Sequence, residues 1–333
     1  MAKIAPTITL YDDDAYAVSF DALVVSARAV PVEEIRGQAA KRLTPNEQKA
    51  KETAVYYEIV LDRTLFFPEQ GGQVSDIGTL RPIGSDCAVT VIDAQINDGI
   101  ITHTVCCEPA QPTNDTAGDD AVMTVLLAGT GVHGEVDFTH RFDFMQNHSG
   151  EHILSGTAHR LYGCDNVGFH LTENEMTLDF SKLLSPEEVA ALEREANAAV
   201  YADKEIVIAY PSEEAAASID YRSKKEIAGR LRIVTIEGVD VCACCAPHVH
   251  RTGEIGFIKV VKIMKNKGGT RLKVVCGWRA YEFLTSEYRL LHEASDMLST
   301  STENVPERIK RFKDEIYALK GEIKGLKAEL QKT

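Results

Sequence analysis

Two short segments of the sequence carry residues that could hold a metal ion. His148 and His152 are four positions apart in the segment His-Ser-Gly-Glu-His, and Cys244 and His248 have the same spacing in Cys-Cys-Ala-Pro-His. Two imidazoles at i and i+4 lie one above the other on a helix face, as a shared metal requires. A His-His-Cys-His set suits tetrahedral zinc better than magnesium or calcium. The sequence therefore predicts a zinc site, provided that the fold brings together two segments about 90 residues apart.

Other residues near the second segment are alternative ligands. Cys242, Cys245 and His250 are close enough in sequence to replace Cys244 or His248. Cysteines clustered in this way are more typical of metal or redox chemistry than of disulfides in a chain expected to be cytoplasmic. The spacing alone therefore leaves the identity of the sulfur ligand open.

The polar residues around the first segment have less specific interpretations. Glu151 is about 100° from His152 around the helix, so we expect a surface or supporting carboxylate rather than a general base. His159 is seven residues beyond His152, about 10 Å along a helix, which is too far to share an ion. His170 could be a polar group near a pocket, but its context favours a hydrogen-bonded core histidine. The sequence assigns no catalytic residue.

The elements that must position these side chains read as a mixture of helices and strands. A helix is predicted over 146–162, ending at Gly163, and a second helix begins at Pro186 after the capping residue Ser185. Apolar runs predict strands at 177–180, 205–209, 231–235, 257–262 and 272–275. The mixed order predicts an α+β fold for residues 136–278, which we expect to form the zinc-containing domain.

Residues 1–135 read mainly as strands and turns. Strands are predicted at 16–20, 55–60 and 89–92, separated by glycine and asparagine breaks. We therefore expect an N-terminal β-barrel-like domain over these residues. Its glycine-rich segment, residues 65–80, predicts a tight turn at Gly71 and Gly72 whose backbone can approach another molecule closely. Gln73 and Asp76 are weak contact candidates beside that turn.

The C-terminal residues 279–333 predict a helical tail. Apolar residues alternate at spacings of three and four, the pattern of a coiled-coil seam with Lys and Glu around it: Ile309, Phe312, Ile316, Leu319, Ile323, Leu326 and Leu330. Gly321 and Gly325 weaken such a helix by about 1 kcal/mol each. The pattern favours a homodimer through residues 305–333, the alternative being a helix packed on its own chain.

Composition and charge exclude some classes of protein. The 333 residues carry 36 Lys and Arg against 50 Asp and Glu, a net charge of −14, and neither a signal peptide nor a membrane-spanning stretch is evident. An acidic total argues against nucleic acid, but six basic residues and no acidic one lie between Ile255 and Cys276. A second basic cluster extends from Arg222 to Arg232, and charge alone favours solvated faces for both.

Three segments together resemble a known family. Leu65-Phe-Phe-Pro-Glu-Gln-Gly-Gly-Gln-Val-Ser-Asp-Ile-Gly-Thr-Leu80, Gln146-Asn-His-Ser-Gly-Glu-His-Ile-Leu-Ser-Gly156 and Cys244-Cys-Ala-Pro-His-Val249 occur in this order. They resemble the glycine-rich, HxxxH and CxxxH segments of the freestanding alanyl-tRNA editing proteins (AlaX family), relatives of the alanyl-tRNA synthetase editing domain. The resemblance covers residues 5–280. One departure is Cys-Cys-Ala-Pro-His, where synthetases usually have Cys-Gly-Gly-Thr-His.

The resemblance implies an activity and a set of site residues. It implies a deacylase that hydrolyses mischarged tRNA(Ala) carrying serine or glycine, with Zn²⁺ as cofactor. The implied zinc ligands are His148, His152, Cys244 and His248. We expect contacts with tRNA or substrate from Gly71, Gly72, Gln73, His170, Lys265, Lys267 and Arg271. Two alternatives remain: a zinc-stabilised tRNA-binding or dimerisation module without hydrolysis, and a zinc hydrolase of another ester or amide.

Overall fold

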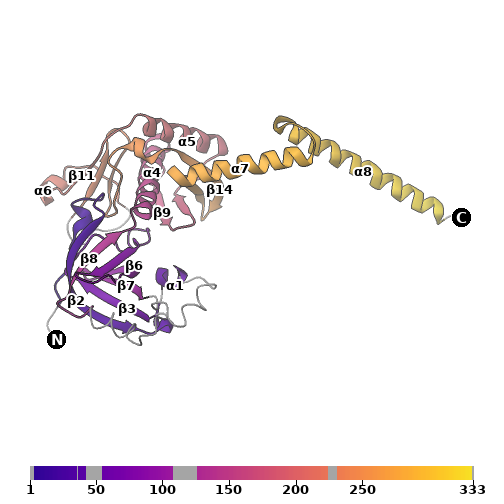
Figure 1. The fold of residues 1–333 in the computed structure, drawn as a ribbon. Coiled ribbons are helices and arrows are strands. Elements are labelled where there is room, and N and C mark those ends of the chain that lie inside the picture. The colour runs from indigo at the N-terminus through magenta and orange to yellow at the C-terminus, as the bar shows by residue number, and fades with distance from the viewer. Residues whose placement is uncertain (1–3, 36, 43–54, 108–125, 224–230, 332–333) are drawn as a thin grey trace, which may run out of the picture. The chain divides into compact units, whose positions relative to one another are not determined.

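The computed structural model describes residues 4–35, 37–42, 55–107, 126–223 and 231–331. The chain forms two compact units, Met1–Trp278 and Arg279–Thr333 (Figure 1). Within the first unit lie a closed barrel and a set of helices and sheets, so the expected α+β class and the expected barrel are confirmed. A domain boundary near residue 135 remains a prediction.

The barrel has six strands in the order β2-β3-β7-β6-β5-β8, and each neighbouring pair is antiparallel. The strands are β2 (Ser19–Val30), β3 (Val55–Leu61), β5 (Gly78–Pro82), β6 (Val89–Asn97), β7 (Ile100–Cys107) and β8 (Gly131–Val136). The long β2 closes the barrel because its first half pairs with β8 and its second half with β3. Alternate residues along β5 and β8 point inward, as the period of two in a strand requires.

Three short elements border the barrel strands. β1 (Ile8–Thr9) pairs in parallel with β4 (Arg63–Thr64), and the six-residue helix α1 (Gly37–Arg42) contacts β6. Arg42, the last residue of α1, donates hydrogen bonds to Glu173 (2.8 Å) and to the Ser75 carbonyl oxygen (2.7 Å). This side chain therefore joins the barrel to the helix-and-sheet part of the first unit.

The rest of the first unit is built around the helix α4 (Phe138–Tyr162). A four-stranded sheet has the order β14-β15-β10-β9, and a three-stranded sheet has the order β11-β12-β13. Their bounds are β9 (Asn166–Leu171), β10 (Met176–Phe180), β11 (Ile206–Ala209), β12 (Ile233–Ile236), β13 (Asp240–Ala243), β14 (Ile258–Asn266) and β15 (Gly269–Cys276). The other helices are α5 (Pro186–Tyr201) and α6 (Glu213–Ala216).

The helix α4 begins eight residues before the predicted start at 146. The Asp137 carboxylate caps it by accepting a hydrogen bond from the His140 amide, and Gly163 ends it in the left-handed conformation, as expected. The first two turns contain aromatic residues of modest helix propensity, so no local pattern predicted them. Burial of Arg141 and Phe144 holds these turns in place.

Most of the remaining predicted elements are confirmed with shifts at their ends, but the predicted strand 16–20 overlaps β2 only at Ser19 and Phe20. Ser185 and Glu188 form a complete capping box at the start of α5. The predicted strands 257–262 and 272–275 are the inner parts of a longer hairpin, β14 and β15, whose turn contains Lys267. Hairpin pairing extends these strands beyond their apolar runs, because backbone hydrogen bonds do not require apolar side chains.

A buried ion pair connects the barrel to α4. Arg141 of α4 donates from Nε to Asp76 Oδ1 (2.9 Å) and from its guanidinium to the carbonyl oxygens of Ala15 (3.0 Å) and Leu65 (2.6 Å). The Asp76 carboxylate also accepts from the Phe67 amide at 2.6 Å. Both charged side chains are almost fully buried. The pair therefore fixes the glycine-rich segment against the helix that carries His148 and His152.

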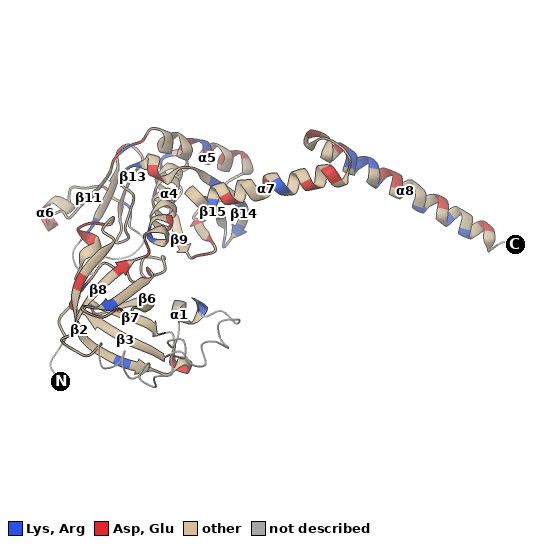
Figure 2. Cartoon of the chain, in the orientation of Figure 1, with Lys and Arg blue, Asp and Glu red and all other residues tan. Residues whose placement is uncertain are grey.

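The second unit consists mainly of two helices. They are α7 (Gly277–Met297), whose first two residues belong to the first unit, and α8 (Val305–Leu330). Residues of both charge signs follow one another along α8 (Figure 2). Among the described residues, no helix combines the length and the apolar character needed to cross a membrane.

The barrel core contains a buried histidine that should make stability depend on pH. His103 pairs with Thr64 Oγ1 through Nε2 (2.9 Å) and with the Ile59 carbonyl oxygen through Nδ1 (3.1 Å). Burial lowers the pKa of His103 from 6.5 to about 4. The neutral ring stabilises the native state above pH 6.5, and this contribution is lost as pH falls from 6.5 towards 4.

We expect the free energy of unfolding to fall by about 2 kcal/mol between pH 7 and pH 4.5 through this group alone. Urea titrations at several pH values, followed by tyrosine fluorescence, measure the effect. A His103→Asn variant, though less stable at pH 7, should lack this part of the acid sensitivity. An identical pH dependence in both proteins would contradict the assignment.

Candidate metal centre

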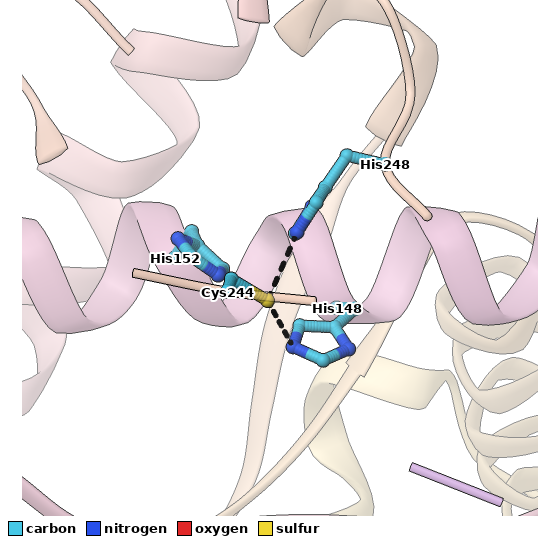
Figure 3. A group of neighbouring side chains, drawn as sticks. All are labelled: His148, His152, Cys244 and His248. Atoms are coloured by element: carbon cyan, nitrogen blue, oxygen red, sulfur yellow. Dashed lines mark hydrogen bonds between the residues drawn. The ribbon is translucent and has the colours of Figure 1, made fainter. Parts of the chain in front are cut away.

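Four side chains from the two predicted segments meet in the first unit. One ligand atom from each of His148, His152, Cys244 and His248 lies within 4.8 Å of the others (Figure 3). The Cys244 sulfur is 3.5 Å from His148 Nε2 and 3.4 Å from His248 Nε2. The three histidines are no more than 2% exposed. The structure therefore brings together the four residues that the sequence singled out, and this group could bind a metal ion.

The two pairs are positioned by different kinds of structure. His148 and His152 stand on successive turns of α4, whereas Cys244 and His248 lie in the loop that follows β13. Arg232 shapes that loop: its guanidinium donates to the carbonyl oxygens of Cys244 and Ala246, each at 2.9 Å. Arg232 is buried, so the solvated face expected for this basic residue is wrong.

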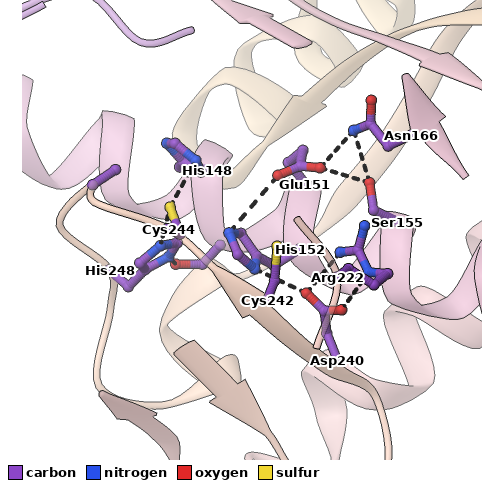
Figure 4. A network of polar contacts seen from close by, with 12 residues as sticks. His148, Glu151, His152, Ser155, Asn166, Arg222, Asp240, Cys242, Cys244 and His248 are labelled. Carbon is purple, nitrogen blue, oxygen red and sulfur yellow. Dashed lines mark hydrogen bonds and ion pairs between the residues drawn. The ribbon is translucent and has the colours of Figure 1, made fainter. Parts of the chain in front are cut away.

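Each histidine ring is held through Nδ1 by a different polar partner. His148 Nδ1 is 2.7 Å from Gln73 Oε1. His152 Nδ1 is 2.9 Å from Asp240 Oδ2, and His248 Nδ1 is 2.9 Å from Ser149 Oγ (Figure 4). Partners of this kind orient metal-binding histidines and fix which nitrogen is free to coordinate. With Nδ1 engaged in all three rings, Nε2 is the atom available to an ion.

The partner of His152 is itself anchored. Arg222 donates to both oxygens of Asp240, at 2.7 and 2.8 Å. Burial would raise the pKa of Asp240, but hydrogen bonds from His152 and Arg222 lower it overall. Gly156 lets this carboxylate approach α4, since a Cβ at that position would lie 2.7 Å from the Asp240 Cβ. Arg222 is thus a structural ion-pair partner and not the solvated cation that charge alone suggested.

The electrostatics of the cluster favour a thiolate. Burial would raise the pKa of Cys244, but the neighbouring His148, together with hydrogen bonds from His148 and His152, lowers it well below its ordinary value. Burial lowers the pKa of His248 to about 3, so this imidazole is neutral. Deprotonated sulfur and neutral imidazole are the forms that coordinate metal ions.

Glu151 is buried, so of the two roles expected for it the surface carboxylate is wrong, and the supporting carboxylate is the one compatible with its position. Its Oε1 accepts hydrogen bonds from Ser155 Oγ and Asn166 Nδ2, each at 2.6 Å. Its Oε2 lies 3.9 Å from His152 Nε2. The carboxylate therefore belongs to the interior beside the metal group, on the side of His152 opposite Asp240 in Figure 4.

The alternative ligands lie outside the four-residue group, although Cys242 is close to His152. His250 is exposed and stacks on Tyr16 with ring centroids 4.1 Å apart. His159 is exposed and pairs with Asp165. Cys242 lies in a second close group with His152 and Asp240. Of the described residues, neither Cys245 nor His250 joins the four-residue group. The choice of Cys244 as sulfur ligand stays a prediction that this geometry supports.

The glycine-rich segment reaches the same cluster. Gly71 and Gly72 have φ of 64° and 86° and form the expected tight turn, closed by two backbone hydrogen bonds between Gln70 and Gln73. A Cβ on Gly72 would lie 2.6 Å from the Phe169 carbonyl oxygen, so the turn packs directly on β9. Gln73 is buried and holds His148, and the expected contacts of Gly71, Gly72 and Gln73 with tRNA or substrate remain predictions. Asp76 is likewise buried against Arg141 and is not a surface contact.

The other contact candidates lie on the four-stranded sheet. His170 of β9 is exposed, which contradicts the expected core position. Lys265 and Lys267, near the tip of the β14–β15 hairpin, are exposed as well. Arg271 of β15 is engaged by the Asp179 carboxylate through two hydrogen bonds of 2.6 Å. Contacts of any of these residues with tRNA or substrate remain predictions.

Sequence reasoning missed the partners that orient the rings. Asp240 and Ser149 have no role in the motifs as read from the sequence, although Ser149 directly follows His148. The hydrogen bond between His152 and Asp240 spans 88 residues. Because buried polar groups are almost always hydrogen-bonded, each histidine ring is expected to have a partner. Which residue is the partner depends on tertiary structure.

Two protein families match parts of the chain. The family described as "Threonyl and Alanyl tRNA synthetase second additional domain" matches residues 231–273, which include Cys244 and His248. The family described as "tRNA synthetases class II (A)" matches residues 26–120, across the barrel strands. Both parts of the first unit are therefore similar to regions of tRNA synthetases.

Individual relatives extend the similarity over most of the chain. It is 33% identical over 283 residues to the alanine–tRNA ligase of Pyrococcus abyssi and 31% identical over 282 residues to that of Methanobrevibacter smithii. The ligase of Ignicoccus hospitalis is 29% identical over 326 residues. These alignments cover 82%, 82% and 95% of this chain but only 29%, 30% and 31% of the relatives.

The chain thus spans about three tenths of the length of the ligases that it matches. The two family matches include the barrel strands β3, β5, β6 and β7 and the CxxxH loop, whereas the HxxxH helix lies outside both. These matches support the resemblance to AlaX-like editing domains related to alanyl-tRNA synthetase.

Proposed function

We propose that the protein is a zinc-dependent hydrolase that removes wrongly attached serine, or glycine, from tRNA(Ala). The observation that carries the proposal is the set of three buried imidazoles, each held at Nδ1, around the half-buried sulfur of Cys244. The similarity to alanine–tRNA ligases supports a tRNA substrate, because those relatives act on alanine and tRNA by name.

The donor set fits zinc. Three imidazole nitrogens and one thiolate are tetrahedral zinc ligands, and their hydrogen-bonded partners are of the type found behind zinc-binding histidines. His148, His152, Cys244 and His248 would hold the ion. Zinc bound there would supply Lewis acidity toward the ester, or would hold the site in shape while water is activated elsewhere.

The chain's own residues position the reacting groups. Asp240, fixed by Arg222, sets the orientation of the His152 ring, and Gln73 sets that of His148. Arg232 holds the carbonyls of the loop that carries Cys244. Since these contacts are already made, little reorganisation is needed when a substrate arrives. Buried walls around the rings limit access of bulk water.

Limited selectivity of an alanine-binding pocket explains why a separate site that hydrolyses the wrong product is useful. A pocket built for alanine cannot strongly reject a molecule of nearly the same size, so an error must be removed afterwards. The editing site must accept a hydroxyl and leave alanine esters intact. Buried hydrogen-bonding groups achieve this, because an alanine side chain would leave them unpaired.

The basic hairpin offers a path for the tRNA backbone. Lys265 and Lys267 are exposed near its tip, while Lys259 and Lys273 pair with Glu193 and Glu175. Exposed lysines contribute electrostatic attraction to phosphate without reading sequence. We infer that this hairpin borders the bound tRNA, despite the net charge of −14.

A paired deacylation assay tests the function. Purified protein is incubated with tRNA(Ala) charged with serine, with glycine or with alanine, before and after chelation and zinc re-addition. Release of serine or glycine but not alanine, lost on chelation and restored by zinc, is the expected result. Tight binding without release indicates a tRNA-binding module, and neither binding nor release indicates a hydrolase of another ester.

Loss of one ligand should remove metal and activity together. In a His152→Ala variant we expect the zinc content to fall to background and serine release to fall by at least about a hundredfold. Zinc is measured by elemental analysis of protein purified without chelator. His159→Ala, an exposed histidine of the same helix, is the matched control. Retention of both zinc and activity in His152→Ala would remove the ligand assignment.

Asp240 should act on the metal through His152. The substitution Asp240→Asn keeps the shape but removes the charge, so we expect zinc affinity to fall by about 10- to 100-fold. Competition with a chromogenic chelator measures this affinity. Asp179→Asn is the matched control, because Asp179 pairs with Arg271 in a similar two-bond arrangement outside the metal group. Equal affinities in the two variants would contradict a positioning role for Asp240.

A further inference from the structure

Within the second unit, the helix α8 presents an exposed apolar stripe. The seven residues of the stripe are between 37% and 75% exposed: Ile309, Phe312, Ile316, Leu319, Ile323, Leu326 and Leu330. Single exposed apolar residues are ordinary, but a continuous stripe along a 26-residue helix indicates an interface. The spacing of three and four residues is that of the a and d positions of a heptad.

The residue types along the stripe indicate the number of strands. Positions a are Ile309, Ile316 and Ile323, followed by Leu330, and positions d include Leu319 and Leu326. β-branched residues at a with leucine at d favour a parallel two-stranded coiled coil over three or four strands. The seam is therefore suited to one partner helix of the same kind.

The charges that flank the seam indicate the orientation. The g positions after Arg308 are all acidic and the e positions all basic: Glu315, Glu322 and Glu329 at g, and Lys313, Lys320 and Lys327 at e. In a parallel pair, each g residue faces the e residue of the following heptad in the other helix. Glu315 then faces Lys320 of the second copy, and Glu322 faces Lys327 of the second copy.

An antiparallel pair would be penalised by the same residues. There, g positions face g positions and e positions face e positions, so glutamates would oppose glutamates and lysines would oppose lysines. Like charges across a seam suppress the wrong partner or orientation. The charge pattern is complementary to itself in the parallel arrangement alone.

We propose that α8 pairs with α8 of a second copy of this chain as a parallel, in-register, two-stranded coiled coil. Both copies then enter the coiled coil from the same end, at Val305. The proposal goes beyond the editing reaction and does not depend on it.

Two features of α8 weaken this pairing without redirecting it. Arg308 at the first g position would face Lys313 of the second copy, an unfavourable pair, although its guanidinium also lies 4.8 Å from the centre of the Phe312 ring. Gly321 and Gly325 occupy the outer f and c positions, where a Cβ would meet no atom within 4 Å. They lower helix propensity but leave the seam intact.

Charge exchange on the full chain tests the cross-strand pairs. Light scattering should find dimers of the unaltered chain at micromolar concentration. In E315K/E322K, the dimer dissociation constant should rise by more than about tenfold at low salt, because attractive g–e pairs become repulsive. E307K/D314K makes the same charge change on the outer f positions and should leave the dissociation constant nearly unchanged.

Mixing two variants distinguishes pairing from general destabilisation. K320E/K327E should also be mainly monomeric, whereas an equimolar mixture with E315K/E322K should form heterodimers, because each lysine at g then faces a glutamate at e. Circular dichroism of each variant at high concentration monitors whether α8 is still helical. Monomers in the unaltered chain, or no heterodimer in the mixture, would overturn the proposal.

Cysteine cross-linking tests the orientation. In a parallel pair, L326C faces the same position of the second copy and should form an intermolecular disulfide, while A328C at the outer f position should not. In an antiparallel pair, Leu326 would face Ile309 of the second copy. Cross-linking between L326C and I309C chains, without L326C homodimers, would overturn the parallel arrangement.

Strengthening the helix should strengthen the dimer. G321A/G325A adds helix propensity on the outer face, so the dissociation constant should fall by about tenfold or more. Light scattering over a dilution series measures it. An unchanged constant, with increased helix content by circular dichroism, would show that α8 does not form the interface.

Discussion

The orientation of three imidazole rings around one sulfur is the constraint on which the site depends. Each ring is held at Nδ1 by a residue from a different place in the fold: Gln73 from the barrel turn, Ser149 from α4, and Asp240 from β13. A half-turn of a ring about its Cβ–Cγ bond would put carbon atoms where Nδ1 and Nε2 now lie, so both contacts would be lost. Three buried polar side chains therefore keep the three Nε2 atoms directed toward the centre of the four-residue group.

This requirement explains why α4 is buried on more than one face. A helix that packs on one sheet normally has one apolar stripe, whereas α4 buries polar residues over several consecutive turns. Arg141 near its start holds the glycine-rich segment through Asp76, and His152 further along reaches Asp240. Each buried polar group has to be paired. Because the partners of Arg141 and His152 lie in different segments, α4 fixes both the barrel and the three-stranded sheet in position.

The structures of the two units depend on different kinds of interaction. In the first, the positions of functional groups follow from many long-range contacts, and small residues such as Gly156 permit close approach. In the second, α8 is an exposed helix whose properties follow from its heptad pattern and its flanking charges. This pattern is encoded locally in the sequence, and it is the basis of the coiled-coil pairing that we propose.

What the sequence determined by itself was local: the HxxxH and CxxxH spacings, the capping box of α5, the turn at Gly71 and Gly72, and the class of fold. These depend on period, propensity and backbone conformation over a few residues. Tertiary structure alone decided that Glu151 is buried, that His170 is exposed, and that Gln73 faces a histidine. The reason is that burial and pairing depend on which distant segments pack together, and no short-range pattern encodes that choice.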